Sequence, residues 1–194
     1  MSNAVEATSH GIDRPVASIH SALYNLVVIV SASLFVALCA RVTVPLPFTP
    51  VPLTMQNLGV LLVGIALGGR RGAAALALYL AEGAAGLLVF SPTGLGGIAQ
   101  LLGPTGGFLI AYPAVAFVAG YISRRFERRF LPTLLGATLA EAVLFASGIS
   151  WLMIAARASA TQAAQMAAVP FVFAEVIKIM AAAAIASRLP KRYF

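Results

Sequence analysis

Charged residues are scarce in this sequence. Of its 194 residues, 10% are Asp, Glu, Lys or Arg and 60% are hydrophobic, and the mean hydropathy is +0.94. A soluble domain carries about 25% charged residues, so this chain has too few polar side chains to cover a water-facing surface. The composition excludes a soluble globular domain, a disordered chain and a disulfide scaffold, and it indicates an integral membrane protein.

Residues that support several common chemistries are also missing. Cys39 is the only cysteine, so an intrachain disulfide or a multi-cysteine metal site cannot form. The two histidines have no partner at a metal-binding spacing, and no metal site is expected. The sequence contains no G-x-x-x-x-G-K-[ST] motif, so the chain has no P-loop for ATP hydrolysis. We therefore expect no catalytic residues and no enzyme.

Long uncharged runs dominate the sequence, at 15–40, 42–69 and 83–123. A transmembrane helix needs roughly 20 mainly apolar residues, so the third run, which glycines and prolines interrupt, is too long for one span. We predict an all-α membrane protein with a bundle of six transmembrane helices. The predicted helices are Ser21–Arg41, Leu53–Leu67, Ala73–Phe90, Thr105–Ile122, Pro132–Ile154 and Val169–Leu189.

The basic residues predict the orientation of this bundle. Ten of the thirteen fall on one side, whereas Arg41 and Arg157 fall on the other. Because Lys and Arg collect in cytoplasmic loops, we predict that both termini are cytoplasmic. Residues 1–18 are predicted to form a cytoplasmic tail and residues 19–194 a single membrane domain. The net charge of +7 is then explained by basic residues that set the membrane orientation, so nucleic-acid binding is not expected. Contact of these residues with anionic membrane lipid stays open.

The two predicted outer loops, at 42–52 and 91–104, are unusual. The first contains four prolines and is mainly apolar. Proline fixes φ and removes a backbone donor, which favours a stiff, extended segment. This loop could be a lid over a ligand or a rigid cap with no ligand beneath it. The second loop is rich in glycine, which allows the backbone to approach a ligand closely.

Four ionisable residues lie inside the predicted spans, where charge is expensive and indicates function. Glu175 and Lys178 are spaced to share one face of the last helix. They could form a mutually neutralising pair, or offer an acceptor and a donor to a small ligand. Glu82 is interpreted as a packing residue that could also line the site, and Glu141 as a helix-packing carboxylic acid.

Small and amide side chains mark two further places. Ser33 and Ala37 form a small-xxx-small face on the first helix, which allows close approach of a helix from the same chain or from another subunit. Gln56 and Asn57 begin the second helix directly after the proline-rich loop. Their amides can cap this helix or reach a ligand under the loop.

Several motifs occur together in a recognisable order. They are Pro45–Gln56, Leu67-Gly-Gly-Arg-Arg-Gly72, Gly86–Phe90, Leu102-Gly-Pro-Thr-Gly-Gly107, and Pro170 followed by Glu175-x-x-Lys178. Over residues 40–190 the chain resembles the BioY family, the biotin-specific substrate-binding (S) components of energy-coupling-factor transporters. The resemblance implies six helices with both termini cytoplasmic and a substrate pocket near the outer face.

The resemblance also implies roles for individual residues. Glu175 would accept hydrogen bonds from the ureido N–H groups of biotin, and Lys178 would donate to the ureido carbonyl. The apolar loop walls would cover the thioether ring and the valeryl chain, and Gln56 would lie near the carboxylate. The family usually has Asp at the position of Glu175. The implied substrate-binding residues are Glu175, Lys178, Gln56, Phe48, Phe90, Ser91 and Glu82.

The function implied is high-affinity capture of biotin from outside, as a subunit of an ABC-type vitamin importer in the bacterial inner membrane. A transmembrane coupling subunit (T component) and a pair of ABC ATPases would supply the energy, and ATP would be used by these partners. The chain itself would need no cofactor. Ser33 and Ala37 would pack against the coupling subunit.

The sequence leaves two alternative functions open. One is an autonomous, proton-coupled secondary transporter in which Glu82, Glu141 and Glu175 form a relay. The other is a non-transporting assembly subunit, in which the Glu175–Lys178 pair holds helices together.

Overall fold

A computed structural model describes residues 13–189 of the chain. This range is mostly helical, and its two strands, β1 (Thr43–Val44) and β2 (Leu53–Thr54), pair antiparallel with Thr43 opposite Thr54. The helices are α1 (Asp13–Arg41), α2 (Gln56–Leu67), α3 (Gly69–Ala84), α4 (Gly97–Leu102), α5 (Gly106–Arg125), α6 (Phe130–Ala155), α7 (Ala160–Ala167) and α8 (Val172–Arg188). The predicted all-α class is confirmed.

Three of the described helices are long and apolar enough to cross a membrane: residues Ile19–Arg41 of α1, and all of α5 and α6. α7 and α8 qualify together as a pair bent by 56°, which gives up to four spans. α2 has only 12 residues and rises about 18 Å at 1.5 Å per residue. Length and composition therefore support an integral membrane protein, and the count of six spans stays a prediction.

The outward-facing side chains agree with a membrane environment. Leu38, Ile154 and Phe173 are 69%, 75% and 79% exposed, and they belong to three different helices. Soluble monomers do not leave so many large apolar side chains in water. The surface of these helices is therefore suited to lipid.

Glycine changes two of the predicted helix boundaries. The third helix covers Gly69–Ala84 and not 73–90, because Gly68 adopts a φ of 80° and allows α3 to begin directly after α2. At the other end Gly86 adopts a φ of 92°, so the chain turns before residue 90. Helix α1 begins at Asp13, inside the range predicted as a tail, while residues 1–12 and 190–194 lie outside the described part.

Small residues allow α2, α3 and α5 to pack closely together. A methyl group on Gly64 would lie 2.8 Å from the Cα atom of Ala116, and one on Gly72 would lie 2.8 Å from the Cα atom of Gly64. Such contacts between backbones are the usual way to hold helices together in lipid, where apolar burial gives little driving force. α2, α3 and α5 therefore form a closely packed centre, against which α6 and α1 pack.

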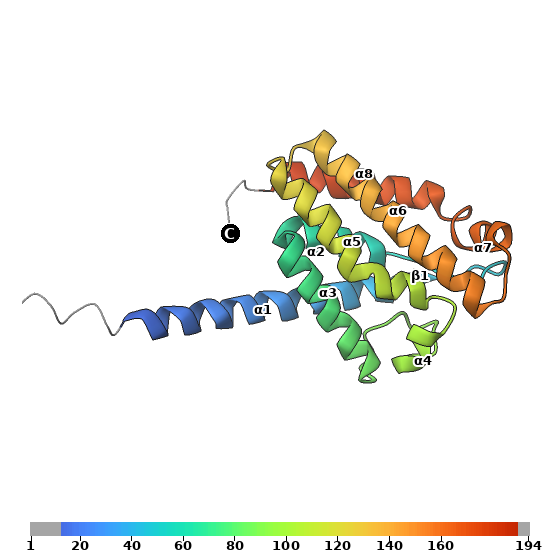
Figure 1. Cartoon of the computed structure of the whole chain (residues 1–194), viewed down its shortest axis with the longest axis horizontal. Helices are drawn as coiled ribbons and strands as arrows, with labels where there is room; N and C mark the ends of the chain where they lie inside the picture. Colours follow the sequence, from blue (N-terminus) through green and yellow to red (C-terminus); the bar gives the residue numbers. More distant parts are fainter. Residues whose placement is uncertain (1–12, 190–194) are drawn as a thin grey trace, which may run out of the picture.

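The two ends of the bundle differ. Figure 1 shows that α1 begins and α8 ends toward the same side, on the left of the view. α4, α7 and the β1–β2 hairpin gather toward the opposite side. The proline-rich loop (42–52) and the glycine-rich loop (91–104) therefore lie at the same end of the bundle, which we call the loop end.

Candidate functional site

A buried ion pair lies at the start of α8. The Nζ atom of Lys178 is 2.7 Å from the Oε1 atom of Glu175, and the side chains are 7% and 9% exposed. Lys178 Nζ also donates a hydrogen bond of 2.6 Å to the carbonyl oxygen of Thr54, in β2. The spacing of three residues on one helix thus produces the pairing that the sequence predicts.

Asn57 connects this pair to a second carboxylate. Its Nδ2 atom donates a hydrogen bond of 2.7 Å to Glu175 Oε2 and a second hydrogen bond to Glu141 Oε1. The three residues belong to α2, α8 and α6, so a single amide joins three helices. The contact agrees with the interpretation of Glu141 as a helix-packing acid.

Two polar atoms of this cluster have no hydrogen-bond partner among the described residues. They are Asn57 Oδ1 and Glu141 Oε2, and both are buried. An unpaired buried donor or acceptor costs about 1–3 kcal/mol. The cluster is therefore incompletely satisfied by the protein itself, which is typical of a site that receives a ligand.

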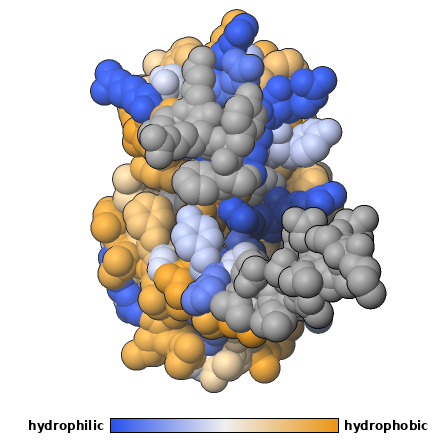
Figure 2. All heavy atoms as spheres, turned by 90° about the vertical axis from the view of Figure 1, so that its left-hand side faces the viewer, coloured by the Kyte–Doolittle hydropathy of each residue, from blue (hydrophilic) through white to orange (hydrophobic). Residues whose placement is uncertain are grey.

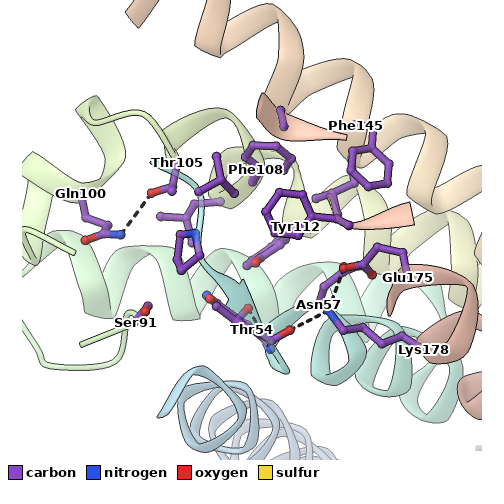
Figure 3. Close-up of a pocket in the computed structure, with 17 residues that line it drawn as sticks. Thr54, Asn57, Ser91, Gln100, Thr105, Phe108, Tyr112, Phe145, Glu175 and Lys178 are labelled. Carbon is purple, nitrogen blue, oxygen red and sulfur yellow. Dashed lines mark hydrogen bonds and ion pairs between the residues drawn. The ribbon is translucent and has the colours of Figure 1, made fainter. Parts of the chain in front are cut away.

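A cavity with an empty volume of about 590 Å³ adjoins the cluster. Figure 3 shows Asn57, Glu175 and Lys178 at one end of this cavity, and Ser91, Gln100 and Thr105 at the other. Apolar and aromatic side chains lie between the two ends. They include Phe108, Leu109, Tyr112, Leu144, Phe145 and Phe171. The cavity therefore has a charged end, an apolar middle and a neutral polar end.

Four of the predicted site residues line this cavity: Glu175, Lys178, Gln56 and Ser91. Gln56 Nε2 donates to the hydroxyl of Tyr79 at 2.6 Å, and that hydroxyl donates to the Val89 carbonyl at 2.9 Å. This chain of bonds fixes the start of α2 against the segment that precedes Ser91. The amide of Gln56 is therefore oriented by the protein itself.

Three other predicted contacts lie outside the cavity. Phe48 is 66% exposed in the proline-rich loop, and Glu82 Oε1 accepts a hydrogen bond of 3.0 Å from Ser33. Phe90 is buried behind the wall, edge-to-face with Tyr79 at 5.4 Å between ring centroids. The ring of Phe90 occupies the space left by the missing side chain of Gly83. Phe90 therefore supports the wall instead of lining it.

The small-residue face of α1 is turned inward in this structure. Ser33 is fully buried and Ala37 is 9% exposed. Ser33 contacts Glu82 on α3, so its helix partner lies within the chain. Contact of this face with another subunit stays a prediction.

Sequence reasoning missed several residues that line the cavity. The sequence predicts Asn57 only as one of two amides at the start of the second helix. No local pattern indicates that its side chain bonds two carboxylates distant in the sequence. Gln100 donates to Thr105 Oγ1 at 3.1 Å and accepts from the Gly96 amide. It is the one strongly polar side chain in the apolar stretch 97–102, a signal that could have identified it.

A second hollow opens from the cavity toward the loop end. It has an empty volume of about 720 Å³ and lies between the proline-rich loop and residues 93–105. Pro52, Gln100 and Thr105 line both spaces. Thr49 in the proline-rich loop donates to the carbonyl of Met166 at the end of α7, at 2.7 Å. The loop is thus fastened to α7, whose Ala167 lines the cavity, and its role as a lid stays a prediction.

The fold matches that of one solved membrane transport component. A crystal structure of the S-component for biotin from an ECF-type ABC transporter matches with a TM-score of 0.80 and 24% identity. The match covers 90% of this chain and 94% of that one. At this sequence identity the match establishes a shared fold and nothing more.

The sequence comparison defines the family. The model of the BioY family matches residues 10–194, and the chain belongs to this family. A biotin transporter BioY of Rhizobium etli is 38% identical over 163 residues, which cover 78% of this chain and 84% of the relative. A probable biotin transporter BioY of Pyrococcus horikoshii is 36% identical over 158 residues, covering 81% and 92%. The family predicted from the motifs is confirmed, and it is a family of transporters, not enzymes.

Proposed function

We propose that this chain is the biotin-binding S component of an energy-coupling-factor importer. The observation that carries the proposal is the buried Glu175–Lys178 pair at one end of a cavity whose walls are otherwise largely apolar. Membership of the BioY family and the named biotin transporters among the relatives support biotin as the ligand.

The unused bonding capacity of the pair matches the ureido ring of biotin. Each oxygen of Glu175 accepts one hydrogen bond from the protein, from Lys178 or from Asn57, and each keeps a second lone pair. Lys178 uses two of its three N–H groups. The pair can therefore still accept from the ureido N–H groups and donate to the ureido carbonyl. Charge-assisted bonds of this kind are stronger than neutral ones.

The rest of the cavity suits the rest of the ligand. Phe108 and Tyr112 provide an apolar surface for the thioether ring and the valeryl chain. The chain would lead to the neutral polar end, where Ser91, Gln100 and Thr105 can donate to its carboxylate. Gln56 lies on the same wall with an amide fixed by Tyr79.

The membrane arrangement that we propose has six helices, both termini in the cytoplasm and the loop end outside, in the bacterial inner membrane. The positive-inside rule supports it, because the α2–α3 and α5–α6 turns carry arginines at the end where α8 finishes. Biotin would then enter from outside through the hollow beside the proline-rich loop.

Energy for transport would come from partners, because the sequence has no P-loop. We propose a coupling T component and two ABC ATPases, with ATP bound by the ATPases and no cofactor in this chain. The alternative proton relay would need Glu82 to join Glu141 and Glu175. Those two meet at Asn57, whereas Glu82 is bonded to Ser33.

Biotin binding by the purified chain tests the proposal. Saturating biotin should raise the melting temperature, since a ligand at 100 times its Kd stabilises the folded state by about 2.7 kcal/mol. Glu175→Gln and Lys178→Met should each weaken binding at least about tenfold, because each removes a charge-assisted hydrogen bond. Arg157→Gln, a charge change on the loop outside the cavity, should leave the affinity unchanged. Near-native affinity in both cavity variants would contradict the proposal.

A further inference from the structure

The Leu67-Gly-Gly-Arg-Arg-Gly72 motif lies far from the cavity, and the biotin site makes no use of it. It forms the sharp turn between α2 and α3, where Gly68 adopts a φ of 80° that favours glycine. The turn packs closely against the C-terminal part of α5. A methyl group on Gly69 would lie 2.8 Å from the Phe117 carbonyl, and one on Gly68 would collide with the Arg124 side chain.

This close packing places two pairs of arginines around one groove. Arg70 and Arg71 come from the start of α3, and Arg124 and Arg125 come from the end of α5. The groove has an empty volume of about 1060 Å³. Gly68 and Gly69 are required for it, because any side chain there would push α5 or Arg124 away.

The groove carries positive charge without a matching acid. Within residues 19–189 the ion pairs join Glu127 to Arg129 and Glu175 to Lys178, and none involves an arginine of the groove. Arg128 and Arg71 both lie near enough to Arg124 for their like charges to repel it. The first backbone amides of α3 also lack helical acceptors at this point, and their dipole favours an anion.

The remaining wall of the groove is apolar. Phe117 and Tyr121 stack with ring centroids 5.9 Å apart, and they are 41% and 59% exposed. Leu67 completes this wall. All three belong to helices of the membrane bundle, so the groove runs from a cationic rim to a surface that faces acyl chains.

Figure 2 shows the molecule from the side toward which α1 begins and α8 ends. Hydrophilic side chains there interrupt an otherwise apolar surface. A phosphate that carries acyl chains matches both parts of the groove at once. A soluble anion would leave the Phe117–Tyr121 surface unused, and an acidic protein segment would not need it.

We propose that this groove is a binding site for an anionic phospholipid. The lipid phosphate would contact Arg71 and Arg124, and an acyl chain would lie along Phe117 and Tyr121. Basic pockets between transmembrane helices commonly bind anionic headgroups in this way. The proposal does not depend on biotin as the transported ligand.

Native mass spectrometry of the full chain in neutral detergent can test this site, with phosphatidylglycerol and phosphatidylcholine as probes. We expect phosphatidylglycerol to bind at least roughly tenfold more tightly, and Arg71→Gln/Arg124→Gln to remove that preference. The matched control is Arg129→Gln/Arg188→Gln, which makes the same charge change at the same end but outside the groove lining. It should keep the preference. Arg71→Lys/Arg124→Lys, which preserves charge and tests for misfolding, should keep most of it.

Three results would overturn the proposal. Equal binding of the two lipids would show that the groove does not select anionic headgroups. An equal loss in the control variant would show that diffuse charge, and not this groove, attracts the lipid. Displacement of the lipid by inorganic phosphate or by a poly-glutamate peptide at matched concentration would assign the groove to a soluble anion or to an acidic protein segment.

Discussion

Asn57 on α2 donates a hydrogen bond of 2.7 Å to the carboxylate of Glu175 on α8. The same amide donates to Glu141 on α6. Two carboxyl groups from distant parts of the sequence are therefore held by one neutral side chain, and the ammonium of Lys178 faces only one of them.

We predict that Asn57→Ala lowers both stability and biotin affinity. The change leaves two buried carboxyl oxygens without donors, and each unpaired group costs about 1–3 kcal/mol. Unfolding in a denaturing detergent series measures the first effect, and biotin titration measures the second. Thr138→Ala, which removes an exposed hydroxyl bonded only within α6, is the control and should change neither. An unchanged affinity in Asn57→Ala would separate this amide from the ligand site.

Removing both members of the buried ion pair should be less damaging than removing one. Glu175→Ala or Lys178→Ala leaves an isolated buried charge and should cost about 3–5 kcal/mol each. The double variant removes both charges of the pair. Its loss in free energy of unfolding should therefore be well below the sum of the two single losses. Equilibrium unfolding of the four proteins gives the coupling energy. Additive losses would contradict a direct interaction. Loss of biotin binding in the double variant distinguishes a ligand site from a purely structural pair.

Thr49→Val should speed the release of biotin. It removes the hydroxyl that fastens the proline-rich loop to the Met166 carbonyl, while the size of the side chain is nearly kept. A hydrogen bond contributes about 0.5–1.5 kcal/mol, which corresponds to a roughly 2- to 12-fold faster dissociation. Stopped-flow dissociation of biotin measures the rate. Thr138 is exposed and bonds only the Leu134 carbonyl within α6, so Thr138→Val serves as the control and should leave the rate unchanged. Equal rates for native protein and Thr49→Val would show that this bond does not hold the loop closed.

Gly64→Ala should destabilise the centre of the bundle. The added methyl would lie 2.8 Å from the Ala116 Cα atom, so α2 and α5 must separate. Overpacking typically costs about 1–3 kcal/mol. Gly103→Ala, at an ordinary φ of −79° and with its nearest atom 3.2 Å away, should cost less. A thermal melt of both variants tests the difference. Equal melting temperatures would show that α2 and α5 do not depend on this contact.

The sequence predicts those parts of the site that depend on local spacing. Glu175 and Lys178 pair because residues three apart on a helix are neighbours, and this holds whatever surrounds them. The position of Phe90 could not be predicted in the same way. Its ring turns away from the cavity because Gly83, on the neighbouring helix α3, leaves a space for it. Which side of a loop faces a ligand depends on such packing across elements.

The difference between local sequence pattern and packing across elements also explains which helix boundaries could be predicted. Uncharged runs locate apolar segments, and they correctly indicate helices near 21–41, 105–122 and 132–154. They do not indicate where the chain turns within an apolar segment. Gly68, Gly86 and the break between α7 and α8 set those points through backbone conformation. The role of Asn57 was beyond prediction for a related reason, since its partners are far away in the sequence.

The short β1–β2 ladder has a mechanical consequence. The prolines make residues 45–52 stiff, so this segment can move as one body about the ladder, with Thr49 as its only side-chain fastening to α7 among the described residues. β2 also carries the Thr54 carbonyl that Lys178 binds. The hinge of the moving segment and the charged end of the cavity therefore share one hydrogen bond. If the proline-rich segment opens as a lid, a ligand that draws Lys178 toward itself would weaken the bond to Thr54, and opening and occupancy would be coupled through that bond.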